Sequence, residues 1–128
     1  MKEIPENPVV AVLGGAGEMG RKAVSIVSGF EGISELIVAD FDLAAAEKIV
    51  AKNTVEAKMS LTAAQVDVTD AKQLAELLDG VAVVLNMTGP FYRLGVSVLQ
   101  AALSAECHYL DICDDWEPTV DMLALNKE

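Results

Sequence analysis

Residues 9–27 read VVAVLGGAGEMGRKAVSIV, and this stretch decides the fold. The apolar run Val9–Leu13 predicts a buried parallel strand, and beyond the glycines apolar residues recur with helical spacing. Between them, Gly15, Gly17 and Gly20 have the spacing G-x-G-x-x-G. We expect Gly15 to allow the tight turn, Gly17 to let a pyrophosphate approach the backbone, and Gly20 to let the helix pack on the strand. This pattern is typical of a dinucleotide site at a helix N-terminus.

The composition indicates a single apolar, acidic domain. The chain has 128 residues, of which 52% are hydrophobic, and its formal net charge is −11. Such a charge argues against a nucleic-acid partner, because binding to nucleic acid is driven by counterion release to Lys and Arg. No apolar run approaches the roughly 18 residues of a membrane span, and MKEIPENP lacks the apolar segment of a signal peptide. We therefore expect a cytoplasmic protein with no membrane partner.

The two cysteines, Cys107 and Cys113, do not form a C-x-x-C pair, which argues against a disulfide scaffold and against a zinc site. We interpret them as reduced structural thiols and expect no metal site.

Strand and helix patterns alternate along the rest of the chain. We predict strands at 35–40, 64–68, 81–85 and 107–113, and helices at 43–52, 71–78, about 92–105 and after 115. Asp42 and Asp70 are expected to cap two of these helices, and Asp114 and Asp115 to cap the last one. Segment 53–63 stays open between an extra helical turn and a loop. Short crossovers of this kind require parallel strands with right-handed connections. The predicted fold is therefore α/β, a Rossmann-type doubly wound parallel sheet of about five strands in the order 3-2-1-4-5, with helices on both faces.

An acidic residue ends the second predicted strand. Asp40 stands twenty residues after Gly20, the distance expected for a carboxylate that binds the adenosine ribose. Phe41 and Asp42 follow it, and no Arg or Lys does. A carboxylate repels a 2′-phosphate, so the pattern favours NAD over NADP as the cofactor. The alternative is that Asp40 only caps the next turn.

Polar residues also follow the third and fourth predicted strands. Asp67 and Val68 end the third, where they can meet an adenine edge, although Asp67 is interpreted equally well as a turn-forming aspartate. The loop NMTGPFY at 86–92 leaves the fourth strand at the point where the sheet order reverses, and Gly89-Pro90 fixes a turn there. Its aromatic residues are candidates either for a ring pocket or for the core.

A catalytic residue is not assigned. His108 lies early in the last predicted strand, away from its carboxyl end, and Asp111 is the better candidate for a polar group that faces the site.

Taken together, VLGGAGEMGR, VADFD, VDVTD, NMTGPFYRLG and HYLDICDD resemble the NAD(P)-binding domain of the saccharopine dehydrogenase family, from about Val9 to Pro118. The resemblance implies nicotinamide-dependent reductive amination, or its reverse, on a small amino-acid-like substrate. Carried over to this chain, it implies a pyrophosphate site at Gly15, Ala16, Gly17, Glu18 and Met19, an adenosine site at Asp40, Phe41, Asp67 and Val68, and a nicotinamide site at Thr88, Gly89, Pro90 and Phe91.

Family members continue into a separate catalytic and dimerising domain, whereas this sequence stops at Glu128. We expect residues 1–128 to be the N-terminal cofactor domain of a longer oxidoreductase acting on CH–NH donors, inactive alone and compatible with a homodimer. The alternative is a stand-alone NAD-sensing regulatory domain without catalysis, similar to those of potassium channels. A short-chain reductase is disfavoured, because neither Tyr92 nor Tyr109 is followed four residues later by Lys.

Overall fold

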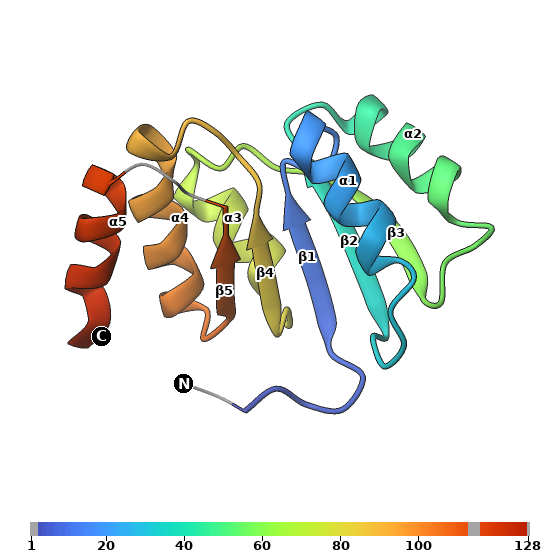
Figure 1. The fold of residues 1–128 in the computed structure, drawn as a ribbon, viewed down its shortest axis with the longest axis horizontal. Helices are drawn as coiled ribbons and strands as arrows, with labels where there is room; N and C mark the ends of the chain where they lie inside the picture. Colours follow the sequence, from blue (N-terminus) through green and yellow to red (C-terminus); the bar gives the residue numbers. More distant parts are fainter. Residues whose placement is uncertain (1–2, 113–115, 128) are drawn as a thin grey trace.

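A parallel sheet of five strands forms the centre of the fold (Figure 1). The computed structural model describes residues 3–112 and 116–127, without the side chains of residues 91, 92, 116 and 127. The strands are β1 (Val9–Leu13), β2 (Glu35–Asp40), β3 (Ser60–Gln65), β4 (Val83–Asn86) and β5 (His108–Asp111). Their order is β3-β2-β1-β4-β5, and each neighbouring pair is parallel. The predicted fold class and strand order are confirmed.

Helices cover both faces of this sheet. They are α1 (Glu18–Val27), α2 (Leu43–Asn53), α3 (Ala71–Leu78), α4 (Phe91–Ser104) and α5 (Trp116–Leu123), followed by a short 3₁₀ helix η1 (Ala124–Lys127). Figure 1 shows α1 and α2 in front of the sheet, α3 behind it, and α5 beside α4. Right-handed crossovers place α1 and α2 on one face, and α3 and α4 on the other, because the direction of strand addition reverses between β1 and β4.

The alternation of side chains along β1 divides the core into two layers. Val10 and Val12 are buried against α1 and α2, together with Val24 and Val27 of α1 and Ala46 of α2. Ala11 and Leu13 belong to the opposite layer, which contains the buried residues of α3 and α4: Leu74, Leu78, Val98 and Ala102. A strand that is apolar on both faces is therefore required at the centre, as its sequence predicts.

The third strand lies earlier in the sequence than predicted. The prediction placed it at residues 64–68, whereas β3 spans Ser60–Gln65 and pairs with β2 alone. An edge strand tolerates polar residues because one side of it stays in water, and the hydroxyl of Thr62 donates to Glu35 on β2 at 2.7 Å. The mixed polar and apolar composition of β3 gives no apolar run by which the strand could be predicted. Asp67 and Val68 consequently lie in the loop after the strand.

Both predicted aspartate caps are confirmed. Asp42 accepts a hydrogen bond from the amide of Ala45 at 3.1 Å. Asp70 accepts from the amides of Lys72 at 3.0 Å and Gln73 at 3.2 Å. Such caps satisfy amides that have no acceptor within the helix. The proposed capping role of Asp114 and Asp115 falls outside the described residues.

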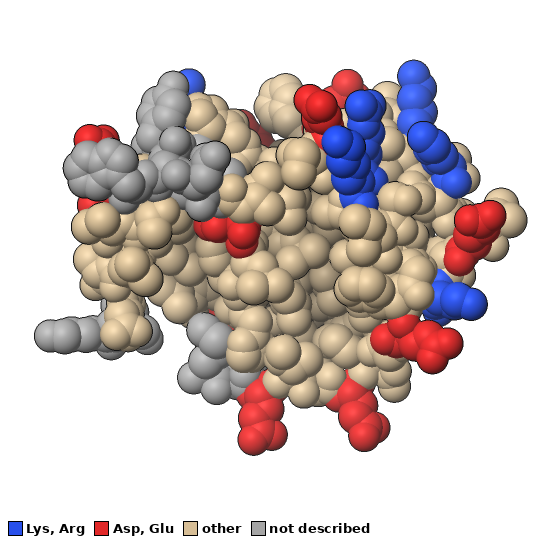
Figure 2. Space-filling view, in the orientation of Figure 1, with Lys and Arg blue, Asp and Glu red and all other residues tan. Residues whose placement is uncertain are grey.

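Figure 2 shows most of the visible Lys and Arg side chains over α1 and α2. Cys107 is fully buried, with its thiol 3.1 Å from the carbonyl oxygen of Val81, and Cys113 lies outside the described residues. Within the described part of the chain, no helix is long and apolar enough to span a membrane. The same residues contain no cluster of three His, Cys, Asp or Glu suited to a metal ion.

Candidate functional site

The loop between β1 and α1 is built around three close approaches that only glycine permits. Gly14, with φ +72°, lies in the left-handed region, and a Cβ there would stand 3.0 Å from the carbonyl oxygen of Met87. A Cβ on Gly15 would stand 2.7 Å from the Val38 side chain, and one on Gly20 only 1.8 Å from the carbonyl oxygen of Gly14. Gly20 thus packs the helix on the loop as predicted.

The role predicted for Gly15 needs correction. The left-handed conformation of the turn is carried by Gly14, the residue before the fingerprint begins. Gly15 is required for a different reason, since any side chain there would collide with Val38 on β2. Two consecutive glycines were visible in the sequence, but the packing of β2 against the turn was not.

Gly17 is the glycine that leaves room for a ligand. It is exposed, it caps α1 without a side chain, and a Cβ there would meet only the carbonyl oxygen of Gly14, at 3.3 Å. The next residues, Glu18 and Met19, are also exposed and form the first helical turn, where amides have no acceptor within the helix. These amides and the positive end of the helix dipole suit a pyrophosphate.

The other amides of the loop already donate within the protein. Gly15 donates to the carbonyl oxygen of Ala39 at 3.0 Å, and Gly17 to that of Gly14 at 3.0 Å. Ala16 donates to Oδ2 of Asp40, also at 3.0 Å. These bonds make the loop rigid before any ligand arrives, and they leave the amides of Glu18 and Met19 as the candidates for phosphate contacts.

Asp40 ends β2 and joins the two neighbouring loops. Its Oδ2 accepts from Ala16, and its Oδ1 accepts from the amide of Asp42 at 3.0 Å. Each carboxylate oxygen has two lone pairs. One acceptor position per oxygen therefore remains for a further donor, such as a ribose hydroxyl.

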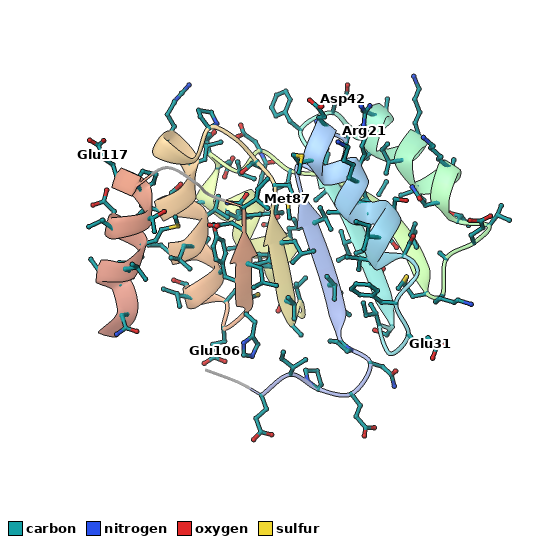
Figure 3. All side chains as sticks on the ribbon, in the orientation of Figure 1. Arg21, Glu31, Asp42, Met87, Glu106 and Glu117 are labelled. Carbon is teal, nitrogen blue, oxygen red and sulfur yellow. The ribbon has the colours of Figure 1, made fainter. Side chains whose placement is uncertain are left out.

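A cleft of about 360 Å³ lies along the carboxyl ends of the strands. It is lined by Gly14, Gly17, Asp40, Phe41, Val66, Asp67, Val68, Thr69, Met87, Thr88, Gly89 and Leu94. Figure 3 shows Met87 near the tip of β4, with Glu31 and Glu106 at the opposite end of the sheet. The cleft therefore opens where the strand order reverses, the place where ligands bind in doubly wound sheets.

The cleft brings together residues from every predicted part of the site. Of the predicted residues it includes Gly17, Asp40, Phe41, Asp67, Val68, Thr88 and Gly89, while Gly15, Ala16, Glu18, Met19 and Pro90 lie around it in the adjoining loops. Phe91 begins α4, and its side chain lies outside the described residues. The prediction omitted Gly14, Val66, Thr69, Met87 and Leu94. All but Leu94 are sequence neighbours of predicted residues, which was the available signal. The helical spacing of Leu94 with the apolar residues that follow it indicates only a core position.

The loop after β3 forms one wall of the cleft and is held by hydrogen bonds. Asp67 accepts from both the amide and the hydroxyl of Thr69, the amide at 2.9 Å. The hydroxyl of Thr69, more than its amide, holds the pKa of the Asp67 carboxyl below its usual value. Gln73 of α3 accepts from the amide of Asp67 at 3.0 Å and donates to Asp70 at 3.1 Å. Asp67 is thus a turn-forming aspartate that also lines the cleft.

A buried amide lies behind the opposite wall of the cleft and bonds to the lining residue Thr88. Asn86, the last residue of β4, is fully buried, and its Oδ1 accepts from the amide of Thr88 at 3.1 Å and from the Thr88 hydroxyl. Its Nδ2 donates to the hydroxyl of Tyr109 at 3.0 Å. That hydroxyl donates in turn to Asp111 at 2.7 Å. Asp111 therefore reaches the cleft through Tyr109 and Asn86. Asn86 begins the loop NMTGPFY that the sequence singles out, but it is not among the predicted site residues.

Gly89 and Pro90 complete this wall. The peptide bond between them is cis, and Pro90 stands as the N-cap of α4. Gly89 lines the cleft and is exposed, and a Cβ on it would meet nothing within 4 Å. The predicted turn is present at this position.

His108 lies far from the cleft. It begins β5 and lines a hollow at the amino end of the sheet, next to Gly80 and Glu106. The placement agrees with the sequence-based argument against a catalytic role for this residue.

The charge distribution limits how the cleft can hold an anion. Asp40 and Asp67 line it, and among the described lining residues there is no Lys or Arg. The groups available to an anion in this cleft are therefore backbone amides rather than cationic side chains.

Comparisons with known proteins agree with this architecture. The family described as saccharopine dehydrogenase NADP binding domain matches residues 10–126. Apo saccharopine dehydrogenase (L-Glu forming) from Saccharomyces cerevisiae superposes with a TM-score of 0.73 at 19% identity, over 90% of this chain and 24% of that one. A short-chain type dehydrogenase/reductase from Mycobacterium ulcerans gives 0.66 at 13% identity, over 81% and 46% of the two chains. A short-chain dehydrogenase from Oenococcus oeni gives 0.66 at 15%, over 84% and 59%.

The structural matches establish a shared fold, and the chain spans between about a quarter and three fifths of the length of these neighbours.

Proposed function

The chain belongs to the saccharopine dehydrogenase NADP-binding domain family, and from this premise we propose that it is the cofactor domain of an oxidoreductase that binds NAD(H). The proposed reaction is hydride transfer at an amine or imine carbon of a small amino-acid-like substrate. When bound, the nicotinamide ring supplies the hydride donor or acceptor. The residues of this chain bind and orient the dinucleotide.

The position of the Asp40 carboxylate is the observation that carries the proposal. It stands at the end of β2, lines the cleft, and is fixed from two sides by the amides of Ala16 and Asp42. A fixed carboxylate with acceptor positions remaining suits the two hydroxyls of an adenosine ribose. Because a 2′-phosphate would bring like charges together in a partly desolvated site, we propose NAD(H) in preference to NADP(H).

The glycine loop supports a diphosphate beside this ribose. Asp40 accepts from Ala16 and so fixes the loop before α1. The open space around Gly17 and the first-turn amides of Glu18 and Met19 follow directly in the chain. Side chains at Gly17 would fill the space needed for close approach of an anion to the backbone. We assign the adenosine half to the side of Phe41 and Asp67, and the nicotinamide half to the side of Thr88 and Gly89.

The cofactor that we propose, NAD, differs from the one that the description of the family names. That description names NADP, whereas neither residue after Asp40 is basic. A cationic side chain at this position is the usual partner of a 2′-phosphate. The chemistry of this loop supports the unphosphorylated cofactor.

Family membership also supports an oxidoreductase over a regulatory NAD sensor. The loop NMTGPFY carries the resemblance together with the strand HYLD. Met87, Thr88 and Gly89 of that loop line the cleft next to the proposed nicotinamide site, and Tyr109 of the strand donates to Asp111 and accepts from Asn86 behind it. A sensor needs only dinucleotide affinity, whereas an oxidoreductase must also expose the nicotinamide to a substrate. We propose the substrate class from the family alone, and assign no catalytic residue.

Calorimetric titration of the purified chain with NADH and with NADPH tests the proposal. We expect saturable binding of NADH, with NADPH at least about tenfold weaker because of the charge of Asp40. Equal or tighter binding of NADPH would overturn the assignment of NAD. Absence of binding by either dinucleotide would overturn the proposed function itself.

A further inference from the structure

A continuous set of hydrogen bonds runs from the proposed nicotinamide side of the cleft to the last strand. It connects Thr88, Asn86, Tyr109 and Asp111, through donor–acceptor distances of 3.1, 3.0 and 2.7 Å. The two middle members are not part of the cleft lining, and Asn86 is fully buried. These hydrogen bonds therefore connect β5 to Thr88, which lines the cleft and can contact a ligand.

The direction of each hydrogen bond follows from the groups involved. The amide of Thr88 can only donate, so the Asn86 atom that faces it at 3.1 Å is the oxygen Oδ1. The other atom of the Asn86 side chain is then the nitrogen Nδ2, which donates to the Tyr109 oxygen. The phenolic hydrogen of Tyr109 is left to bond to Asp111. A flipped Asn86 amide would place two donors against each other.

This order fixes the polarity of the Thr88 hydroxyl. Its hydrogen is directed at Oδ1 of Asn86, because that oxygen carries no hydrogen of its own. Only the lone pairs of Thr88 Oγ1 are left for the cleft, which Thr88 lines. The hydroxyl is therefore an acceptor toward a ligand, although a free threonine hydroxyl can both donate and accept.

We propose that Tyr109 is a positioning residue, which acts through Asn86 to present Thr88 as a hydrogen-bond acceptor to the nicotinamide riboside half of the cofactor. This inference rests on the proposed function. The matching ligand group is a donor, either a hydroxyl of that ribose or the N–H of the carboxamide. Adenosine and the diphosphate lie on the other side of the cleft and do not depend on Tyr109.

The variant Tyr109→Phe removes the hydroxyl and keeps the ring. Nδ2 of the buried Asn86 then loses its acceptor, so the amide is free to rotate away from Thr88. The matched control is Thr62→Val, which removes a hydroxyl from a hydrogen bond to Glu35 on the β2–β3 edge, away from the cleft. Both variants delete one oxygen from a partly buried or exposed sheet position.

The experiment compares the dissociation constants of NADH and ADP for the whole chain. ADP carries the adenosine and the diphosphate but lacks the nicotinamide riboside. For Tyr109→Phe we expect about three- to tenfold weaker binding of NADH, the size of one lost hydrogen bond, with ADP binding unchanged. Thr62→Val should change neither constant.

Further variants identify the route and the ligand group. Thr88→Val should weaken NADH binding as much as Tyr109→Phe does, whereas Thr88→Ser should keep the wild-type affinity. In the Thr88→Val background, Tyr109→Phe should cause no further loss of NADH affinity. The analogue with an acetyl group in place of the carboxamide distinguishes the two donors. It binds more weakly than NADH to the wild type only if the carboxamide N–H is the donor. If the ribose donates, both dinucleotides lose affinity equally in Thr88→Val.

Three results would overturn the inference. Unchanged NADH binding in Tyr109→Phe would show that the network does not act on the cofactor. Equal losses for NADH and ADP would reduce Tyr109 to a structural role. If Tyr109→Phe does not fold, the comparison of single and double variants is not possible. Thr88→Val then serves as the test, and NADH binding that is unchanged in Thr88→Val rejects the inference. Failure of the proposed function is distinguished from failure of this inference by the wild-type titration. A wild-type chain that binds neither NADH nor ADP rejects the proposed function, whatever the variants do.

Discussion

The carboxylate of Asp40 accepts a hydrogen bond from the backbone amide of Ala16 at 3.0 Å, across 24 positions of sequence. The residue proposed to select the adenosine ribose thereby also fixes the loop proposed to hold the diphosphate. Ligand recognition and loop geometry are coupled in one side chain, so substitutions at Asp40 should affect both.

Replacement of Asp40 tests this coupling. Asp40→Ala removes both the charge and two hydrogen bonds to loop amides. We expect NADH affinity to fall at least about tenfold, the value of a hydrogen bond to a charged group. The preference for NADH over NADPH should also decrease, because like-charge repulsion is lost. Titration calorimetry with both dinucleotides measures the two effects.

Asp40→Asn is the matched control for charge. It keeps an acceptor for one of the two loop amides, so its stability should lie between those of the wild type and Asp40→Ala. The ratio of NADPH to NADH affinity should rise in both variants. A ratio identical to that of the wild type in both would mean that the ribose binds elsewhere.

The glycines at 17 and 20 should respond oppositely to alanine. A Cβ at Gly17 meets one carbonyl oxygen at 3.3 Å, so Gly17→Ala should fold normally and lose dinucleotide affinity. A Cβ at Gly20 would stand 1.8 Å from the carbonyl oxygen of Gly14, so Gly20→Ala should destabilise the fold by about 1–3 kcal/mol or more. Urea unfolding and NADH titration separate the two effects. Retained affinity in Gly17→Ala would place the phosphates away from this loop.

The carboxyl of Asp67 should titrate below its ordinary pKa of 3.8, chiefly because the Thr69 hydroxyl donates to its ionised form. A lowered pKa in the folded state stabilises the fold above the unfolded value, and this stabilisation is lost as the pH falls through the folded pKa. Thr69→Val should move the pKa of Asp67 back toward 3.8, as followed by NMR of the carboxyl carbon. An unchanged titration would exclude the Thr69 hydroxyl as the chief cause.

The cap of α3 should support the adenosine wall of the cleft. Asp70→Ala removes the acceptor of two helix amides and of Gln73, which itself accepts from the amide of Asp67. We expect a loss of about 1 kcal/mol in the free energy of unfolding, measured by urea. Asp70→Asn should lose less, because asparagine caps helices nearly as well. Equal losses in the two variants would contradict a capping role.

Much of the fold and part of the cleft were predictable from local patterns. The apolar residues of β1, the spacing of Gly15, Gly17 and Gly20, and the acid at the end of β2 each depend on a few neighbouring residues. Short right-handed crossovers then favour a single strand order and place the ligand at the carboxyl ends of the strands. For this reason the sequence could indicate Asp40 and Asp67 as neighbours of a single cleft, from two separate segments, whereas Thr88 was indicated by the family resemblance.

The errors concern features with no local pattern. β3 begins at Ser60 because pairing with β2 stabilises a strand that is polar on its outer edge. Gly14 rather than Gly15 takes the left-handed conformation, and the approach of Met87, just after β4, and of Val38 in β2 leaves no room for a side chain at either glycine. Neither neighbour is close in sequence.

The amino-acid sequence by itself determined the order of the elements, the two-layer core and the edge at which a dinucleotide is proposed to bind, because side-chain periodicity and glycine sterics act over a few residues. Only the tertiary structure decided which polar groups face each other. The bonds from Ala16 to Asp40 and from Asn86 to Tyr109 join residues 24 and 23 positions apart. Such contacts depend on strand register, which the whole sheet sets together.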